Sequence, residues 1–184
     1  MKPVAREELL DYATYQEGRA AYRERLMALK AARRIHVGEQ LTFLFENRDT
    51  IRYQVQEMLL AERIVKEAEI RHELETYNEL LGAAGELGAT LLIEIESPEE
   101  RALKLAAWLD LPGALYARLP DGRLVRPTFD QRQIDEQRLS SVHYVKFATG
   151  GQVPVALGCE HPDLRAETVL TAPQRQAMAD DLAG

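Results

Sequence analysis

The residues whose types and spacing could do chemistry gather where an apolar run, 41–45, ends in a polar corner, 46–50. A helix that begins at this corner would present free backbone N–H groups and a partial positive charge, and Arg48 would add a full one. This combination suits a small anion. A carboxyl at Glu62, if buried, could then accept or donate a proton. The residues that we expect to line such a pocket are Glu46, Asn47, Arg48, Asp49, Glu57 and Glu62.

The same corner also fits a structural role. Asn47, Asp49 and Thr50 are good N-cap residues, so the corner is predicted to turn a strand into a helix. Glu62 falls on the apolar stripe expected for that helix, which consists of Ile51, Val55, Met58 and Val65. A carboxylate there needs a partner, and Arg48 or Arg52 could supply one. Because structural ion pairs perturb carboxylates as strongly as catalytic sites do, we favour the structural interpretation and keep the pocket as its alternative.

Three other candidates have simpler interpretations. Glu69 and His72 have the Glu-x-x-His spacing of di-iron bundles, but the sequence has no second copy and His72 falls on a charged helix face. Cys159 follows an apolar run, which predicts a buried cysteine at a strand end rather than a catalytic pair with His161. His143 alternates with apolar residues, which predicts a hydrogen-bonded core histidine. A metal site that combines Glu residues with His72 or His161 stays a third alternative.

The composition is that of a globular protein, and we expect one domain over residues 1–184. Of the 184 residues, 46% are hydrophobic and 29% charged. The formal charge of −7 argues against nucleic-acid and anionic-membrane partners. One cysteine excludes an internal disulfide framework and thiolate-rich metal sites. We find no signal peptide and no run as long as a membrane span, so we expect a cytoplasmic protein without a cofactor.

The elements that must position these residues follow from periodicity and turn signals. Helices are predicted over 6–12, 15–32, 49–63, 66–81, 97–109, 130–139 and 171–182. Strands are predicted over 34–37, 41–45, 89–96, 114–119, 123–126, 142–148, 153–157 and 167–170. Short connections predict hairpins over 34–45, 114–126 and 142–157. The fold class is therefore α+β, with a mainly antiparallel sheet built from hairpins and helices packed on one face or at its ends.

Residues 44–50, 54–59 and 61–64 resemble the signature of an uncharacterised bacterial family, the domain of unknown function 3501. Residues 72–80 and 85–87 are similar to its next block, and the resemblance extends over nearly the whole chain. The family has no assigned activity to carry over to particular residues. The resemblance implies a gene neighbourhood that includes a rubrerythrin-like protein and an iron–sulfur oxidoreductase of heterodisulfide-reductase type, and hence a role in redox or oxidative-stress chemistry.

Two functions follow as expectations, and neither settles whether the chain is an enzyme. The first is an accessory protein that binds redox partners, here the rubrerythrin-like protein or the iron–sulfur oxidoreductase, and carries no cofactor itself. The alternative is an enzyme or a small-anion-binding protein with its pocket at the strand-to-helix corner 46–50.

Overall fold

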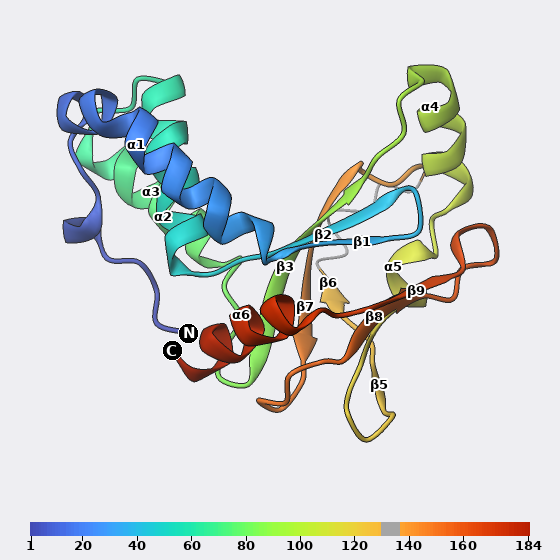
Figure 1. Cartoon of the computed structure of the whole chain (residues 1–184). Coiled ribbons are helices and arrows are strands. Elements are labelled where there is room, and N and C mark those ends of the chain that lie inside the picture. Colours follow the sequence, from blue (N-terminus) through green and yellow to red (C-terminus); the bar gives the residue numbers. More distant parts are fainter. Residues whose placement is uncertain (130–136) are drawn as a thin grey trace.

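The structure, a computed structural model, describes residues 1–129 and 137–184, and Figure 1 shows a group of helices beside two sheets. The helical lobe consists of α1 (Tyr12–Ala31), α2 (Arg48–Ala61) and α3 (Glu67–Asn78). The remaining helices are α4 (Pro98–Ala107), α5 (Leu111–Ala114) and α6 (Ala172–Ala183), with short 3₁₀ helices at Arg6–Glu8 and Pro162–Leu164. No helix within the described ranges combines the length and the apolar character needed to cross a membrane.

Both sheets are antiparallel, so the α+β prediction is confirmed. Among the described residues, the larger sheet has the order β1–β2–β3–β7–β6 and the smaller one β5–β4–β8–β9. The larger sheet contains β1 (Arg34–Val37), β2 (Leu41–Phe45), β3 (Glu86–Ile93), β6 (Thr128–Phe129) and β7 (Val142–Ala148). The smaller sheet contains β4 (Leu115–Arg118), β5 (Leu124–Val125), β8 (Ala156–Cys159) and β9 (Ala166–Val169).

The predicted hairpin of β1 and β2 forms because its apolar residues alternate in matching register. Ile35 lies opposite Phe43, and Val37 lies opposite Leu41. Gly38 makes the turn with a φ of 64°, a left-handed conformation that glycine adopts without a steric cost. Every residue of β2 is buried, since β2 pairs with β1 on one side and with β3 on the other. The strand that leads into the corner is therefore held on both edges.

The buried apolar residues fall into two clusters. The larger cluster lies between the sheets and includes Phe43, Phe45, Leu91, Phe147 and Trp108. The second cluster joins the N-terminal segment to α2 and α3 and consists of Val4, Leu9, Ile51, Val55, Leu59, Ile70, Leu74 and Leu81. Most of the predicted apolar stripes of α2 and α3 appear in it. The strand β2 therefore connects two separately packed regions of the chain.

One predicted hairpin is wrong. Residues 142–148 form β7 of the larger sheet, whereas β8 belongs to the smaller sheet and pairs with β4 and β9. The intervening turn packs against another loop, because the Gly151 N–H and the Thr149 hydroxyl both donate to the Gly85 carbonyl. The Val155 N–H then donates to the Arg118 carbonyl and directs the chain into the smaller sheet.

Two of the predicted helices, 6–12 and 130–139, are not confirmed as predicted. The first helix, expected over 6–12, is only the 3₁₀ turn Arg6–Glu8, because Asp11 caps α1 and starts it at Tyr12. The helix predicted to begin at Asp130 and Gln133 lies outside the described residues up to position 136. Its expected end is not helical, since the Leu139 N–H donates to the Leu105 carbonyl.

Candidate functional site

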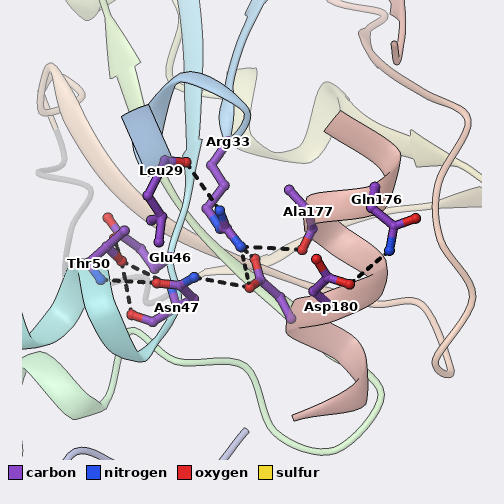
Figure 2. Close-up of polar contacts among 9 residues, drawn as sticks. Leu29, Arg33, Glu46, Asn47, Thr50, Gln176, Ala177 and Asp180 are labelled. Carbon is purple, nitrogen blue, oxygen red and sulfur yellow. Dashed lines mark hydrogen bonds and ion pairs between the residues drawn. The ribbon is translucent and has the colours of Figure 1, made fainter. Parts of the chain in front are cut away.

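The corner between β2 and α2 is built as the sequence predicts. The Asn47 side chain accepts a hydrogen bond from the Thr50 N–H at 3.0 Å, and the Thr50 hydroxyl accepts one from the Asn47 N–H at 2.9 Å. These reciprocal bonds form a capping box, which satisfies two backbone donors that would otherwise lack partners. Figure 2 shows Glu46, Asn47 and Thr50 pointing toward one another at this corner. The strand-to-helix turn is therefore rigid.

Glu46 points into the protein. Its side chain is 2% exposed, and its carboxylate accepts hydrogen bonds from Thr50 at 2.5 Å, Gln54 at 2.9 Å and Thr90 at 2.6 Å. All three donors are neutral, and Thr90 belongs to β3. A buried carboxylate is costly unless hydrogen bonds compensate for lost water, and these three bonds do so. Glu46 thereby ties the first turns of α2 to the sheet.

A buried ion pair lies directly behind the corner. The Arg33 guanidinium makes two hydrogen bonds to the Asp181 carboxylate, each 2.8 Å long. The Asn47 amide donates to the same carboxylate at 3.1 Å. Figure 2 shows the Arg33 side chain and Asn47 converging on α6, beside Ala177. These contacts join the end of α1, the corner and α6, although sequence reasoning named neither Arg33 nor Asp181 as a partner of Asn47.

Arg48 is bound to the N-terminal segment rather than exposed to a ligand. Its guanidinium donates to both carboxylate oxygens of Glu8 at 2.7 Å and to the carbonyls of Lys2 and Pro3 at 2.8 and 2.7 Å. Together with Glu8, backbone atoms of the N-terminal residues therefore occupy the donors predicted to hold an anion. The expected pairing of Arg48 or Arg52 with Glu62 is wrong. Arg52 bonds instead to Asp49 and to the Tyr22 hydroxyl.

Three of the predicted pocket residues do share a hollow. Asn47, Arg48 and Asp49 line a surface hollow of about 220 Å³ with Asp180 and Asp181. Glu8 already neutralises Arg48, Asp49 and Asp181 are paired with Arg52 and Arg33, and Asp180 adds a negative charge, so the hollow lacks the positive field that an anion requires. A ligand at these residues stays a prediction.

Glu57 lies two turns farther along α2 and faces α1. Its carboxylate accepts two hydrogen bonds from Arg19, at 2.8 and 2.6 Å, and one from the Tyr15 hydroxyl at 2.6 Å. The Arg19 hydrogen bonds, followed by the Tyr15 bond, hold the pKa of Glu57 below its usual value against the opposing effect of burial. Burial and the carboxylate of Glu57 raise the pKa of the Tyr15 phenol. This cluster joins α1 to α2 and is separate from Glu46.

The expectation that Glu62 is buried on an apolar stripe is wrong. Glu62 is exposed and is the C-cap of α2, which ends at Ala61. Arg63 follows with a φ of 55°, and the Ile64 N–H donates back to the Leu59 carbonyl. This reversal is a Schellman motif, and it ends the helical periodicity on which the stripe was extrapolated. Val65 is exposed for the same reason.

The other candidate residues are Cys159 and the histidines at positions 72, 143 and 161. Cys159 is buried at the end of β8, as predicted, and burial raises the pKa of its thiol. The hydrogen bond that joins it to His161 comes from the histidine backbone, while the imidazole contacts Asp110 and Asp163. His72 is exposed, as predicted. His143 is buried, but neither ring nitrogen has a hydrogen-bond partner among the described residues.

Metal-ligating side chains do not cluster in the described part of the chain. Among residues 1–129 and 137–184, no three His, Cys, Asp or Glu side chains gather as a group that could hold a metal ion. The described residues therefore do not support the predicted alternative of a metal site formed by Glu residues with His72 or His161.

The helical lobe carries a surface feature that sequence reasoning missed. Two hollows of about 730 and 380 Å³ lie beside α1 and share Tyr12 and Leu60 as lining residues. We call the pair the α1 groove and define it by its larger apolar residues that are not buried, which are Leu10, Tyr12, Met27, Leu60, Ile64 and Val65. Met27, an apolar residue that is exposed on the predicted 15–32 helix, was the available signal.

Comparisons with known proteins place the chain among similar ones. A family model described as "Protein of unknown function (DUF3501)" matches residues 3–182. A crystal structure of a novel protein of unknown function from Burkholderia pseudomallei K96243 is similar, with a TM-score of 0.90 and 29% sequence identity. That similarity covers 98% of this chain and 100% of the other. No curated protein matches the chain.

Proposed function

The chain belongs to the DUF3501 family, and we propose that it is a cytoplasmic accessory protein that binds a redox partner through the α1 groove. The observation that carries this proposal is the exposure of apolar side chains along the groove. Leu10, Tyr12, Met27 and Val65 are all large, exposed hydrophobic residues. Exposed apolar residues rimmed by polar ones, here Gln16, Arg19, Arg23 and Glu24 in the larger hollow, typically mark an interaction site.

The shape of the groove supports a helical occupant. The groove follows α1 from Tyr12 to Met27, which at about 1.5 Å per residue spans about 22 Å. An amphipathic helix of about four turns has the same length and presents apolar residues at a spacing of three to four. The apolar side chains of this partner helix would contact Tyr12, Leu60 and Met27. The occupant that we propose is therefore an amphipathic helix of the partner protein.

The charges along the groove support an acidic residue in the middle of that helix. Arg23 and Glu24 both line the larger hollow, and in the described part of the chain neither forms an ion pair, so Arg23 is the cation that the hollow offers to a partner and Glu24 the anion. Arg19, which lines the same hollow, is already bound to Glu57. A carboxylate on the partner helix could therefore pair with Arg23 while its apolar residues contact Tyr12 and Met27. Such rim pairs direct orientation more than they add affinity.

The proposed partners are the rubrerythrin-like protein and the iron–sulfur oxidoreductase that the family resemblance implies. The test is a titration of this protein with each purified partner, with binding measured by calorimetry. We expect association at micromolar concentration with at least one of them. If neither associates, the redox-partner proposal is wrong, whatever the groove itself binds.

A further inference from the structure

A third hollow, on the opposite side of α1, has a different character. We propose that it binds a small organic monocarboxylate whose body is apolar. The hollow measures about 280 Å³, just below the usual range for ligand pockets, so only a small ligand fits. Its lining residues come from α1 and the first turns of α2: Tyr22, Arg25, Leu26, Leu29, Asp49 and Arg52.

Two guanidinium groups converge on one aromatic ring in this hollow. The Arg25 and Arg52 guanidinium carbons lie 5.9 and 5.7 Å from the centre of the Tyr22 ring. Arg52 is also held in place, because its Nε donates to the Tyr22 hydroxyl at 2.9 Å and its Nη2 to Asp49 at 2.7 Å. Its direction is thus fixed before any ligand arrives. Arg52 therefore forms a fixed wall of the hollow, and Arg25 is the guanidinium that is left to contact a ligand.

The net charge of the hollow favours a monoanion. Asp49 neutralises one of the two guanidinium groups, and Arg25 forms no ion pair or hydrogen bond within residues 1–129 and 137–184. One positive charge is therefore left for a ligand. A guanidinium matches the two oxygens of a carboxylate in a bidentate arrangement, which makes a carboxylate the best complement for Arg25.

The remaining lining is apolar and accounts for the body of the ligand. Leu26 is buried, Leu29 is half-buried, and the Tyr22 ring is stacked near Tyr53 with centroids 6.1 Å apart. An aryl or short alkyl group could contact this surface while its carboxylate reaches Arg25. This assignment differs from the predicted corner pocket, since Arg25 and Arg52 replace Arg48 as the cationic residues.

The test is a titration with benzoate in which binding is monitored through the backbone amide NMR signals of α1 and α2. Benzamide, which has the same shape without the charge, and inorganic phosphate, which has charge without an apolar body, are the comparison probes. We expect saturable shifts with benzoate and at least about tenfold weaker binding of both comparison probes. Arg25→Gln should weaken benzoate binding by at least about tenfold, because charge-assisted hydrogen bonds are lost.

The control variant is Arg175→Gln, which removes an exposed arginine from α6 and should leave benzoate binding unchanged. Arg25 has no protein carboxylate partner among the described residues, so its variant should fold normally. Three results would overturn the proposal. These are no saturable binding of benzoate at millimolar concentration, equal binding of benzamide or phosphate, and unchanged binding to Arg25→Gln.

Discussion

Arg33 and Asp181 are 148 positions apart in the sequence, yet their side chains form a buried two-pronged ion pair with both N–O distances at 2.8 Å. The pair also receives a hydrogen bond from Asn47. It therefore links the helical lobe, the capped corner of α2 and the C-terminal helix at one point. We infer that this contact determines how α6 is positioned against the corner.

We expect Asp181→Asn to lower the free energy of unfolding by about 3–5 kcal/mol, because it leaves the Arg33 charge buried without a partner. Chemical denaturation measures this difference. Asp180→Asn is the matched control, since Asp180 bonds to Gln176 on the exposed side of the same helix, and it should change stability by less than about 0.5 kcal/mol. The double variant Arg33→Met with Asp181→Leu should recover most of the loss. Equal losses of stability in Asp181→Asn and Asp180→Asn would contradict this account.

Arg63 offers a stabilising substitution. Its φ of 55° is a left-handed conformation that costs a residue with a side chain about 1 kcal/mol, and the Schellman motif at the end of α2 normally has glycine there. Arg63→Gly should therefore raise the free energy of unfolding by up to about 1 kcal/mol. Arg175→Gly at the fourth residue of α6 should instead lower it, by up to about 1 kcal/mol. Thermal denaturation of both variants measures these differences. Destabilisation by Arg63→Gly would contradict the assignment of the Schellman motif.

Glu57 should make stability depend on pH in the acid range. Its folded-state pKa lies below the usual value for a glutamate, so its contribution is complete above that usual pKa and is lost as the pH falls through the lowered value. Glu57→Gln should cost about 1 kcal/mol at neutral pH, an amount reduced by partial exposure of the Arg19 pair. The difference between the two proteins should shrink at lower pH. A difference that is constant from pH 7 to pH 3 would rule out this linkage.

Cys159 should react slowly in the folded protein. Its side chain is 1% exposed, and burial raises the pKa of the thiol, so little thiolate is present or accessible at pH 8. A thiol-reactive dye should label it at least about tenfold faster after denaturation. Comparable rates in the folded and unfolded protein would show that the thiol is accessible after all.

The local features of the corner could be predicted, because the residues that make them are close in the chain. Asn47 and Thr50 supply each other's hydrogen bonds within one helical turn. The helix predicted over 171–182 begins in the same way, because Thr171 and Gln174 are also one turn apart and both reciprocal bonds of a capping box are present. At Ser97 and Glu100, where the same pattern predicts a capping box, only half of it forms: the Ser97 side chain accepts from the Glu100 N–H, but the Glu100 side chain makes no return bond to the Ser97 N–H.

The partners of the charged residues could not be predicted, because each depends on tertiary packing. Arg48 pairs with Glu8 and Glu46 bonds to Thr90, and nothing in the spacing of these residues selects those partners over others. The Glu62 error has a specific cause. A glycine at this position would have indicated the end of α2, but the residue is Arg63. The apolar periodicity of the helix was therefore extended too far.

The wrong hairpin between β7 and β8 has a similar explanation. The residues Thr149-Gly150-Gly151 are typical of a hairpin turn, and that signal is the same whether the following strand returns to its own sheet or enters another. The choice is made by contacts with Gly85 and Arg118, which lie far away in the chain.

The most direct test of the proposed function compares two matched substitutions in the partner titration. Val65→Glu places a charge in the α1 groove, at a side chain that is 71% exposed, whereas Val169→Glu makes the same change on β9 at 67% exposure. Neither change should destabilise the protein appreciably, because both sites are largely solvated. We predict that Val65→Glu weakens partner binding by at least about tenfold while Val169→Glu has no effect. Equal affinity of both variants for the partner would contradict the assignment of the α1 groove as the binding surface.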